Sequence, residues 1–245
     1  MYQLKKLPLV TLVSSVLLLA ACGDDKIVEV IKEVEVEVPA PVPTPVDFSY
    51  EITVTNLTNS QPLSPVAVIL HKQSHVFSVG GIASLELEQM AEGGDNSSLL
   101  NWGFALASTS GAAPIGPGAS ETMMITIQDV SDANLSVASM LVNTNDGFSG
   151  LDAWNVSQLA VGDSWITNAF TYDAGTEANT EATGTIPGPA DGSEHAGFNT
   201  NRNDTGYISM HPGVVSRDDG LSTSILTQAH KFDNPSVRIK VTRIE

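Results

Sequence analysis

Short stretches in which apolar and polar residues alternate recur along this chain, and they constrain its fold more than any other feature. In residues 50–57, YEITVTNL, the apolar Tyr50, Ile52 and Val54 alternate with polar residues, which is typical of a strand with one buried face. Residues 66–70, VAVIL, are continuously apolar, which predicts a strand buried on both faces. Further strands are predicted at 121–128, 135–143, 164–172, 207–211 and 237–244.

Turn residues and two helical segments complete the pattern. Glycine, proline, asparagine and aspartate separate the strands, and many short strands with such turns favour an antiparallel β-sandwich. Residues 82–91 and 97–107 have helical spacing, which predicts two short helical insertions. Residues 174–203 are rich in Gly, Thr, Asn and Pro and lack apolar periodicity, so we expect a long loop of the kind that often carries function. The expected fold class is all-β with short helical insertions.

The first 22 residues have the features of a lipoprotein leader. Lys5 and Lys6 precede an apolar run at 7–21 that is too short to span a bilayer stably. The run ends in Leu-Ala-Ala-Cys, a small-residue cleavage pattern, and Cys22 is the only cysteine of the chain. We therefore predict a signal peptide at 1–21 and lipid attachment at Cys22, which would anchor the protein to a bacterial membrane. Gly23 after Cys22 favours the outer membrane or cell surface.

A single cysteine also limits how the domain is stabilised and where it begins. Without a second thiol no intramolecular disulfide forms, so packing, with or without a metal, must hold the fold together. Residues 24–47 contain a Val/Glu alternation and then recurrent proline, which favours a semi-rigid extended spacer. The Val/Glu part also suits a short strand or coiled segment of the domain. The expected organisation is a leader at 1–21, a lipidated spacer at 22–47 and one domain at 48–245.

The chain is strongly acidic, with 28 acidic and 11 basic residues and a formal net charge of −17. Such a surface repels nucleic acid and anionic lipid, so no nucleic-acid partner is expected. Acidity suits cation binding, solubility or a saline habitat, and composition does not choose between them.

Two acidic motifs follow predicted strands. The first is NDGFSGLD at 145–152, and the second is YDAGTE at 172–177. If the strands are neighbours, Asp146, Asp173 and Glu177 converge on one hard cation, because calcium takes carboxylate and carbonyl oxygens and tolerates irregular loops. The alternative is that these Asp-Gly pairs are only turn residues.

Several ordered stretches resemble the spondin N-terminal domain family, which occurs in animal matrix proteins and as single-domain bacterial proteins. They span most of residues 50–243 and read YEITVTNLTNSQPLSPVAVILH, LSVASMLVNTNDGFSGLD, YDAGTEAN and TGYISMHPGV. The resemblance implies a β-sandwich related to calcium-dependent phospholipid-binding modules, with one cation at one end.

The resemblance also implies a ligand set. Carried over to this chain, the metal ligands are Asp146, Asp173 and Glu177, with Asp152 in a supporting role. Glu177 departs from the family, in which animal members have Asp. Animal members act in adhesion and matrix assembly next to thrombospondin-type repeats, which this chain lacks, so no particular animal partner follows.

Two other chemistries receive weaker support. The five histidines include His71 and His75 at the i, i+4 spacing of a helical zinc site, but they follow a predicted strand, where that geometry does not apply. Gly162-Asp163-Ser164 resembles a nucleophile block of esterases, yet no matching Asp-x-x-His follows near the C-terminus. It is better explained as a turn. His211-Pro212-Gly213 suits a strand end capped by a rigid turn.

The sequence thus predicts a lipid-anchored binding or adhesion module with a calcium site, rather than an enzyme. Its partners would be the membrane, through the lipid, and a protein or glycan ligand at the cell surface. The alternative is a structural or accessory periplasmic lipoprotein in which the cation only stabilises the fold.

Overall fold

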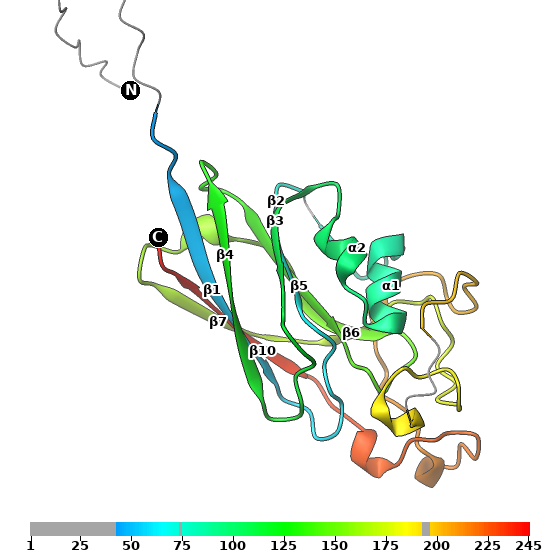
Figure 1. The fold of residues 1–245 in the computed structure, drawn as a ribbon. Helices are drawn as coiled ribbons and strands as arrows, with labels where there is room; N and C mark the ends of the chain where they lie inside the picture. Colours follow the sequence, from blue (N-terminus) through cyan, green and yellow to red (C-terminus); the bar gives the residue numbers. More distant parts are fainter. Residues whose placement is uncertain (1–42, 74, 193–196) are drawn as a thin grey trace, which may run out of the picture. The chain divides into compact units, whose positions relative to one another are not determined.

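Two antiparallel sheets face each other in the structure, a computed structural model that describes residues 43–73, 75–192 and 197–245. Figure 1 shows them as the two layers of a sandwich. The predicted all-β sandwich with short helical insertions is confirmed. The predicted signal peptide, Cys22 and all of the spacer up to residue 42 lie outside the described residues. Residues Pro45–Glu245 form one compact unit.

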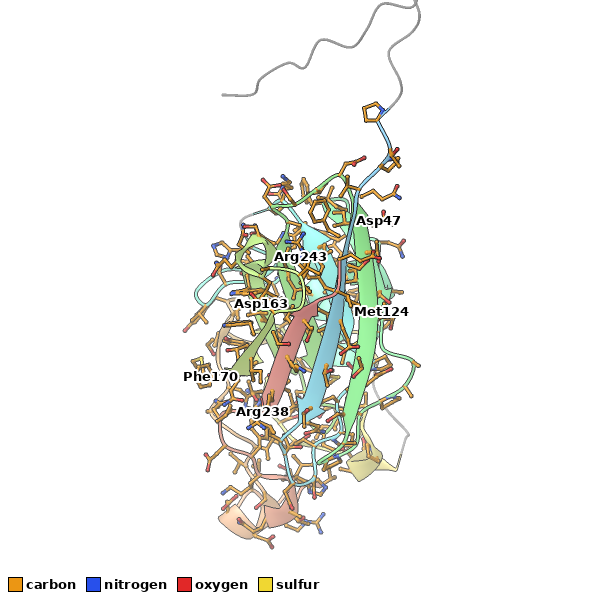
Figure 2. All side chains as sticks on the ribbon, turned by 90° about the vertical axis from the view of Figure 1, so that its left-hand side faces the viewer. Asp47, Met124, Asp163, Phe170, Arg238 and Arg243 are labelled. Carbon is orange, nitrogen blue, oxygen red and sulfur yellow. The ribbon has the colours of Figure 1, made fainter. Side chains whose placement is uncertain are left out.

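The first sheet has four strands in the order β4-β1-β10-β7. Their bounds are β1 Asp47–Asn56, β4 Ser120–Gln128, β7 Ser164–Ala169 and β10 Val237–Arg243. The alternation in β1 turns Tyr50, Ile52 and Val54 inward, where all three are buried, as the sequence predicts. Figure 2 shows this sheet from its outer side, where Met124 and Arg238 lie.

The second sheet has six strands in the order β3-β2-β5-β6-β8-β9. Their bounds are β2 Ala67–His71, β3 Ala105–Ser110, β5 Asn134–Met140, β6 Gly147–Asn155, β8 Thr171–Asp173 and β9 Ser209–Met210. Every residue of β2 is buried, as predicted for a strand covered on both faces.

Two apolar cores lie on opposite sides of the second sheet. Val68 and Leu70 of β2 face the other sheet, while Ala67 and Ile69 face the helical insertion. Leu87 and the other apolar side chains of α1 complete the second core. Both cores lie within residues 45–245, so this unit contains the packing that holds the described fold together.

The helical insertion differs from its prediction in extent. Helix α1 spans Leu85–Gly93; it begins after Ser84, whose Oγ accepts a hydrogen bond from Leu87 N, and ends before Gly94 at φ 69°. Helix α2 covers only Ser97–Leu100. The predicted helix at 97–107 is therefore wrong in its second half, because Ala105–Ser110 alternates with period two and pairs with β2 as an edge strand.

Two further corrections concern strands. The predicted strand at 164–172 breaks at the exposed Phe170, so that β7 belongs to the first sheet and β8 to the second. Strand β6 was not predicted, because its glycines and its run of consecutive buried residues hide the alternation. At Gly150 a Cβ atom would lie 2.1 Å from Val137 O, so glycine permits the close approach of β5.

Long connections gather beyond the ends of the strands on one side of the molecule (Figure 1). The described part of 174–203 contains no strand, as predicted. A small core of Ile186, Val214 and Leu226 joins this loop to the segment after β9. Single-turn 3₁₀ helices occur at Val156–Gln158, Pro189–Asp191, Arg217–Asp219 and Gln228–His230.

In the part of the chain that the structure describes, no helix has the length and apolar character needed to cross a membrane.

Candidate metal centre

The pairing of β6 with β8 brings the two acidic motifs together. Gly147 and Asp173 are register partners in this antiparallel ladder, so Asp146 and Asp173 lie beside each other at its end. A tight turn sets Asp146 in place: Thr144 Oγ1 accepts a hydrogen bond from Gly147 N at 2.9 Å and donates one to Leu141 O at 2.6 Å. The expected neighbourhood of the two aspartates is therefore observed.

A third aspartate completes the cluster. Asp146, Asp173 and Asp204 each offer a carboxylate oxygen, and these oxygens lie within 4.8 Å of one another. Asp146 and Asp173 are buried, whereas Asp204 is exposed. The group of three carboxylates therefore reaches from the interior to the surface.

Asp146 is the buried end of the cluster, with no exposed surface. Its Oδ2 accepts hydrogen bonds from Thr176 N at 2.8 Å and Glu177 N at 3.0 Å. Its Oδ1 is buried and has no partner among the described residues. Burial raises the pKa of this carboxyl to about 7, and the charge of Asp173 adds to the effect. A buried oxygen without a partner is costly, so Asp146 calls for a proton or a cation.

Asp173 is held by its own loop. Its Oδ1 accepts a hydrogen bond from Gly175 N at 2.7 Å, and its Oδ2 accepts one from Asn179 Nδ2 at 2.6 Å. Gly175 has φ 70°, and a Cβ atom there would lie 2.3 Å from Tyr207 O. Both the left-handed backbone and the close approach require glycine.

Asp204 is the ligand candidate that the sequence analysis missed. It sits in the connection before β9, just after the predicted loop, and Gly206 N donates a hydrogen bond to Gly175 O at 2.8 Å. Burial raises the pKa of its carboxyl, and the charge of Asp173 raises it further. Long-range contacts bring it to Asp173, namely the pairing of β8 with β9 and the hydrogen bond from Gly206 to Gly175, and no local motif marks it.

Glu177 does not take the expected place in the cluster. Its backbone N–H binds Asp146, but its carboxylate is not one of the three that converge, and Asp204 stands in that position. Burial raises the pKa of the Glu177 carboxyl to about 7, and the nearby charge of Glu92 is the next cause.

Asp152 lies apart from the three aspartates, roughly 20 Å along β6 from Asp146 at the usual rise per residue. Its Oδ1 accepts hydrogen bonds from Val76 N at 2.7 Å and Ser136 Oγ at 3.2 Å, and its Oδ2 meets His75 Nδ1 at 2.6 Å. These contacts anchor the segment after β2 to β6, a role distant from the cation cluster.

The histidines take other roles where they are described, and His195 lies outside that part of the chain. His71 is buried and its Nε2 lies 2.8 Å from Ser136 Oγ, while His75 pairs with Asp152. Neither belongs to a cluster of three metal-binding side chains among the described residues. His211 accepts a hydrogen bond from Gly213 N at 3.0 Å, which is the predicted turn, and burial lowers its pKa to about 4.

The Gly-Asp-Ser block is a turn, as expected. Gly162 has φ 88°, and Asp163 N donates a hydrogen bond to Ala160 O at 3.0 Å just before β7 begins.

Comparison with known proteins yields no family model that matches this chain and no curated protein that matches it. The resemblance to the spondin N-terminal domain family therefore stays a prediction.

Proposed function

We propose that this chain is a lipid-anchored module of the bacterial cell envelope that binds calcium through Asp146, Asp173 and Asp204 and presents the cation to an acidic ligand. The observation that carries the proposal is the unpartnered Oδ1 of Asp146, which is fully buried within a cluster of three converging carboxylates. A divalent cation supplies the missing partner and neutralises the like charges.

The donor atoms favour calcium among the common divalent cations. All three candidate ligands are carboxylate oxygens, which are hard donors, and they come from the turn before β6, the end of β8 and the connection before β9 rather than from one rigid element. Calcium accepts 6–8 oxygens in flexible geometry. Zinc prefers nitrogen and sulfur in a tetrahedral site.

The cluster leaves room for a ligand. With one oxygen from each carboxylate, the three aspartates fill fewer positions than the 6–8 that calcium takes, and Asp204 is the least buried of the three. Water or the carboxylate of a protein or glycan ligand would complete the shell on that side.

Exposed apolar side chains lie close to this opening. Gly80 N donates to Ile208 O and Ile208 N donates to Gly81 O, each at 2.7 Å, so the segment before α1 runs beside the Asp204–Ser209 segment. Val79, Ile82 and Tyr207 on these segments are 58%, 75% and 48% exposed. Apolar side chains exposed on two adjacent segments suit an interaction site, which supports a binding module.

The anchor is inferred from the sequence alone. The leader, Cys22 and the spacer at 22–47 predict a domain attached through lipid and held away from the membrane. Adhesion at the cell surface is the expected role.

A second candidate, a structural or accessory lipoprotein, is favoured by one observation. Asp146 binds the Thr176 and Glu177 amides, so a cation here would cross-link loops even without a ligand.

Cation binding is tested by calorimetric titration of calcium into residues 45–245. We expect binding that Asp173→Asn and Asp204→Asn weaken at least tenfold. The matched control is Asp233→Asn, which changes an exposed aspartate whose side chain makes no hydrogen bond or ion pair with the described residues. Unchanged affinity in both site variants would refute the site.

A europium ion in place of calcium separates the two candidate functions. Its luminescence lifetimes in H₂O and D₂O count the waters in the inner shell. An open site keeps several waters and loses some of them when acetate is added as a carboxylate probe. Few inner-shell waters, unchanged in number when acetate is added, would favour the structural candidate.

A further inference from the structure

Strand β7 forms one edge of the four-stranded sheet, and one side of its backbone lacks a partner strand among the described residues. It pairs only with β10. At the start of this ladder Arg243 N donates a hydrogen bond to Asp163 O at 3.0 Å. Hydrogen-bonded and non-bonded pairs alternate along an antiparallel ladder. The alternation therefore directs the N–H and C=O groups of Ser164, Ile166 and Asn168 away from β10.

The other sheet edges in the described part of the chain are shorter or covered. The edge strands β3 and β4 contact each other, and Glu121 of β4 accepts a hydrogen bond from Ala112 N at 2.6 Å. Strand β9 has only two residues. Proteins usually protect a free edge with charged residues, proline or a bulge, but β7 reads SWITNA and has neither charge nor proline. Its free edge is therefore open to the addition of a further strand.

Apolar groups are exposed along this edge. Ile166 in the middle of β7 is 58% exposed, and Phe170, directly after the strand, is also exposed. Figure 2 shows Phe170 beyond the end of β7 at the side of the sheet. A hollow at the edge is lined by Ile166, Thr167, Asn168 and Arg238.

The inner side of the edge presents an aromatic surface. Trp165 of β7 stacks on Trp154 of β6, with ring centroids 4.2 Å apart and an interplanar angle of 5°. Both rings are only half-buried. Apolar side chains on the inner face of an added strand would cover these rings and remove apolar surface from water.

The outer side of the edge carries positive charge. Arg238 and Lys240 of β10 are the register partners of Asn168 and Ile166. Neither cation forms an ion pair with the residues that the structure describes. Arg238 Nε donates a hydrogen bond to Asn168 Oδ1 at 3.3 Å, so the guanidinium lies over β7. In a chain of net charge −17, two unpaired cations at one edge favour an acidic partner.

We propose that β7 binds an extended segment of a partner protein by strand addition, and that apolar and acidic residues alternate in this segment. The apolar side chains would face Trp165, and the acidic side chains would face Arg238 and Lys240. Main-chain hydrogen bonds give affinity in this mode of recognition, and alternate side chains give specificity. The proposal does not depend on the calcium site, because none of its three aspartates lies on β7 or β10.

The first test is a titration of a capped peptide of alternating valine and glutamate into residues 45–245 with chelator present. Tryptophan fluorescence and calorimetry measure the binding. We expect one peptide per domain, with an affinity that falls as salt is added. A peptide with lysine in place of every glutamate should bind at least tenfold more weakly.

Two variants locate the binding to this edge. Ile166→Pro removes an outward N–H group at a position where an edge strand accepts proline, and it should weaken peptide binding at least tenfold. Arg238→Gln should weaken it several-fold and reduce its salt dependence. Lys72→Gln is the matched control, because it removes one exposed positive charge at the end of β2, where Lys72 pairs with Asp132. Its affinity for the peptide should be unchanged.

N-methylated peptides test strand addition without any change to the protein, also if Ile166→Pro fails to fold. Successive N–H groups of a strand point to opposite edges, so methylation of only the valines, or of only the glutamates, blocks one edge of the peptide. We expect one of these two peptides to lose binding at least tenfold and the other to keep it. Equal affinities of the two would overturn strand addition.

Three further results would overturn the proposal. They are the absence of peptide binding, an affinity that neither Ile166→Pro nor Arg238→Gln changes, and a dimer of residues 45–245 that Ile166→Pro dissociates. The dimer, detected by sedimentation, would assign the edge to a second copy of this chain. All of these results leave the proposed calcium site standing.

Discussion

Polar side chains are common both on the outer face of the four-stranded sheet and at the loop end of the six-stranded sheet. The two regions differ in whether these side chains find hydrogen-bond partners. On the four-stranded sheet, hydroxyls pair across neighbouring strands: Thr53 with Thr122 at 2.9 Å and Thr55 with Ser120 at 2.8 Å. Figure 2 shows this face. At the loop end, Asp146 and Glu92 are buried with free oxygens. The hydroxyls of the first region bind one another, whereas the buried carboxylate oxygens of the second lack a partner among the described residues.

Truncation of a side chain in the sandwich core should have the largest effect on the free energy of unfolding, and this effect should not depend on calcium. Ile52→Ala removes a fully buried side chain between the sheets, so we expect a loss of about 3–4 kcal/mol in the free energy of unfolding. Denaturant unfolding with calcium and with chelator measures it. A loss that differs between the two conditions by more than about 1 kcal/mol would mean that the core and the loop end are coupled, contrary to the comparison above.

Gly175→Ala should damage both stability and calcium response. The left-handed backbone and the approach of Tyr207 O leave no room for a Cβ atom, so we expect a loss of about 3 kcal/mol and weaker calcium binding. Gly184→Ala is the control: its φ is 82° and nothing lies within 4 Å, so only the backbone strain of about 1–2 kcal/mol should appear. Equal effects of the two variants would contradict the packing described around Gly175.

The cation-free domain should lose stability as pH rises. Folding raises the pKa of Asp146 from 3.8 to about 7 and that of Glu177 from 4.5 to about 7. Between pH 4 and 7 the folded state therefore binds more protons than the unfolded chain, and the free energy of unfolding falls through this range. Each unit of pKa shift corresponds to about 1.4 kcal/mol.

Calcium should oppose this trend, because it binds the deprotonated carboxylates. Unfolding midpoints at pH 5.5 and 8.0, with calcium and with chelator, make the comparison, and Asp146→Asn should flatten the slope in chelator. A cation-free domain that is more stable at pH 8.0 than at pH 5.5 would argue against the burial of these acids.

The smallest effect is expected on the outer face of the first sheet. Thr53→Val removes one hydroxyl of an exposed cross-strand pair and keeps the β-branched shape. We expect a change of less than about 0.5 kcal/mol in stability and none in calcium affinity. A larger calcium-dependent change would show that this face also contributes to binding.

The sequence predicts the sandwich well because its signals are local. Tyr50, Ile52 and Val54 alternate in one strand, and the apolar run of β2 shows burial on both faces. Strand β6 escapes prediction because Gly150 is needed for a close approach that only the partner strand reveals. The second half of the helix predicted at 97–107 fails because Ala105–Ser110 alternates with period two and pairs with β2.

Two of the three aspartates of the site are predictable from the sequence, because they lie in local motifs. Asp146 and Asp173 stand in visible motifs, and the ladder between β6 and β8 joins them as expected. Asp204 carries no motif and reaches the cluster through β9, while the Glu177 carboxylate is not among the three that converge. Convergence that depends on three segments far apart in the chain cannot be deduced from spacing.

The most direct test of the central claim is a crystal structure of residues 45–245 grown with calcium, with the ion located by anomalous scattering. We expect a peak between Asp146, Asp173 and Asp204, with carboxylate oxygens at about 2.3–2.6 Å and with Asp146 Oδ1 among the ligands. A structure at saturating calcium with no ion there, and with Asp146 Oδ1 hydrogen-bonded as a neutral carboxyl, would contradict it.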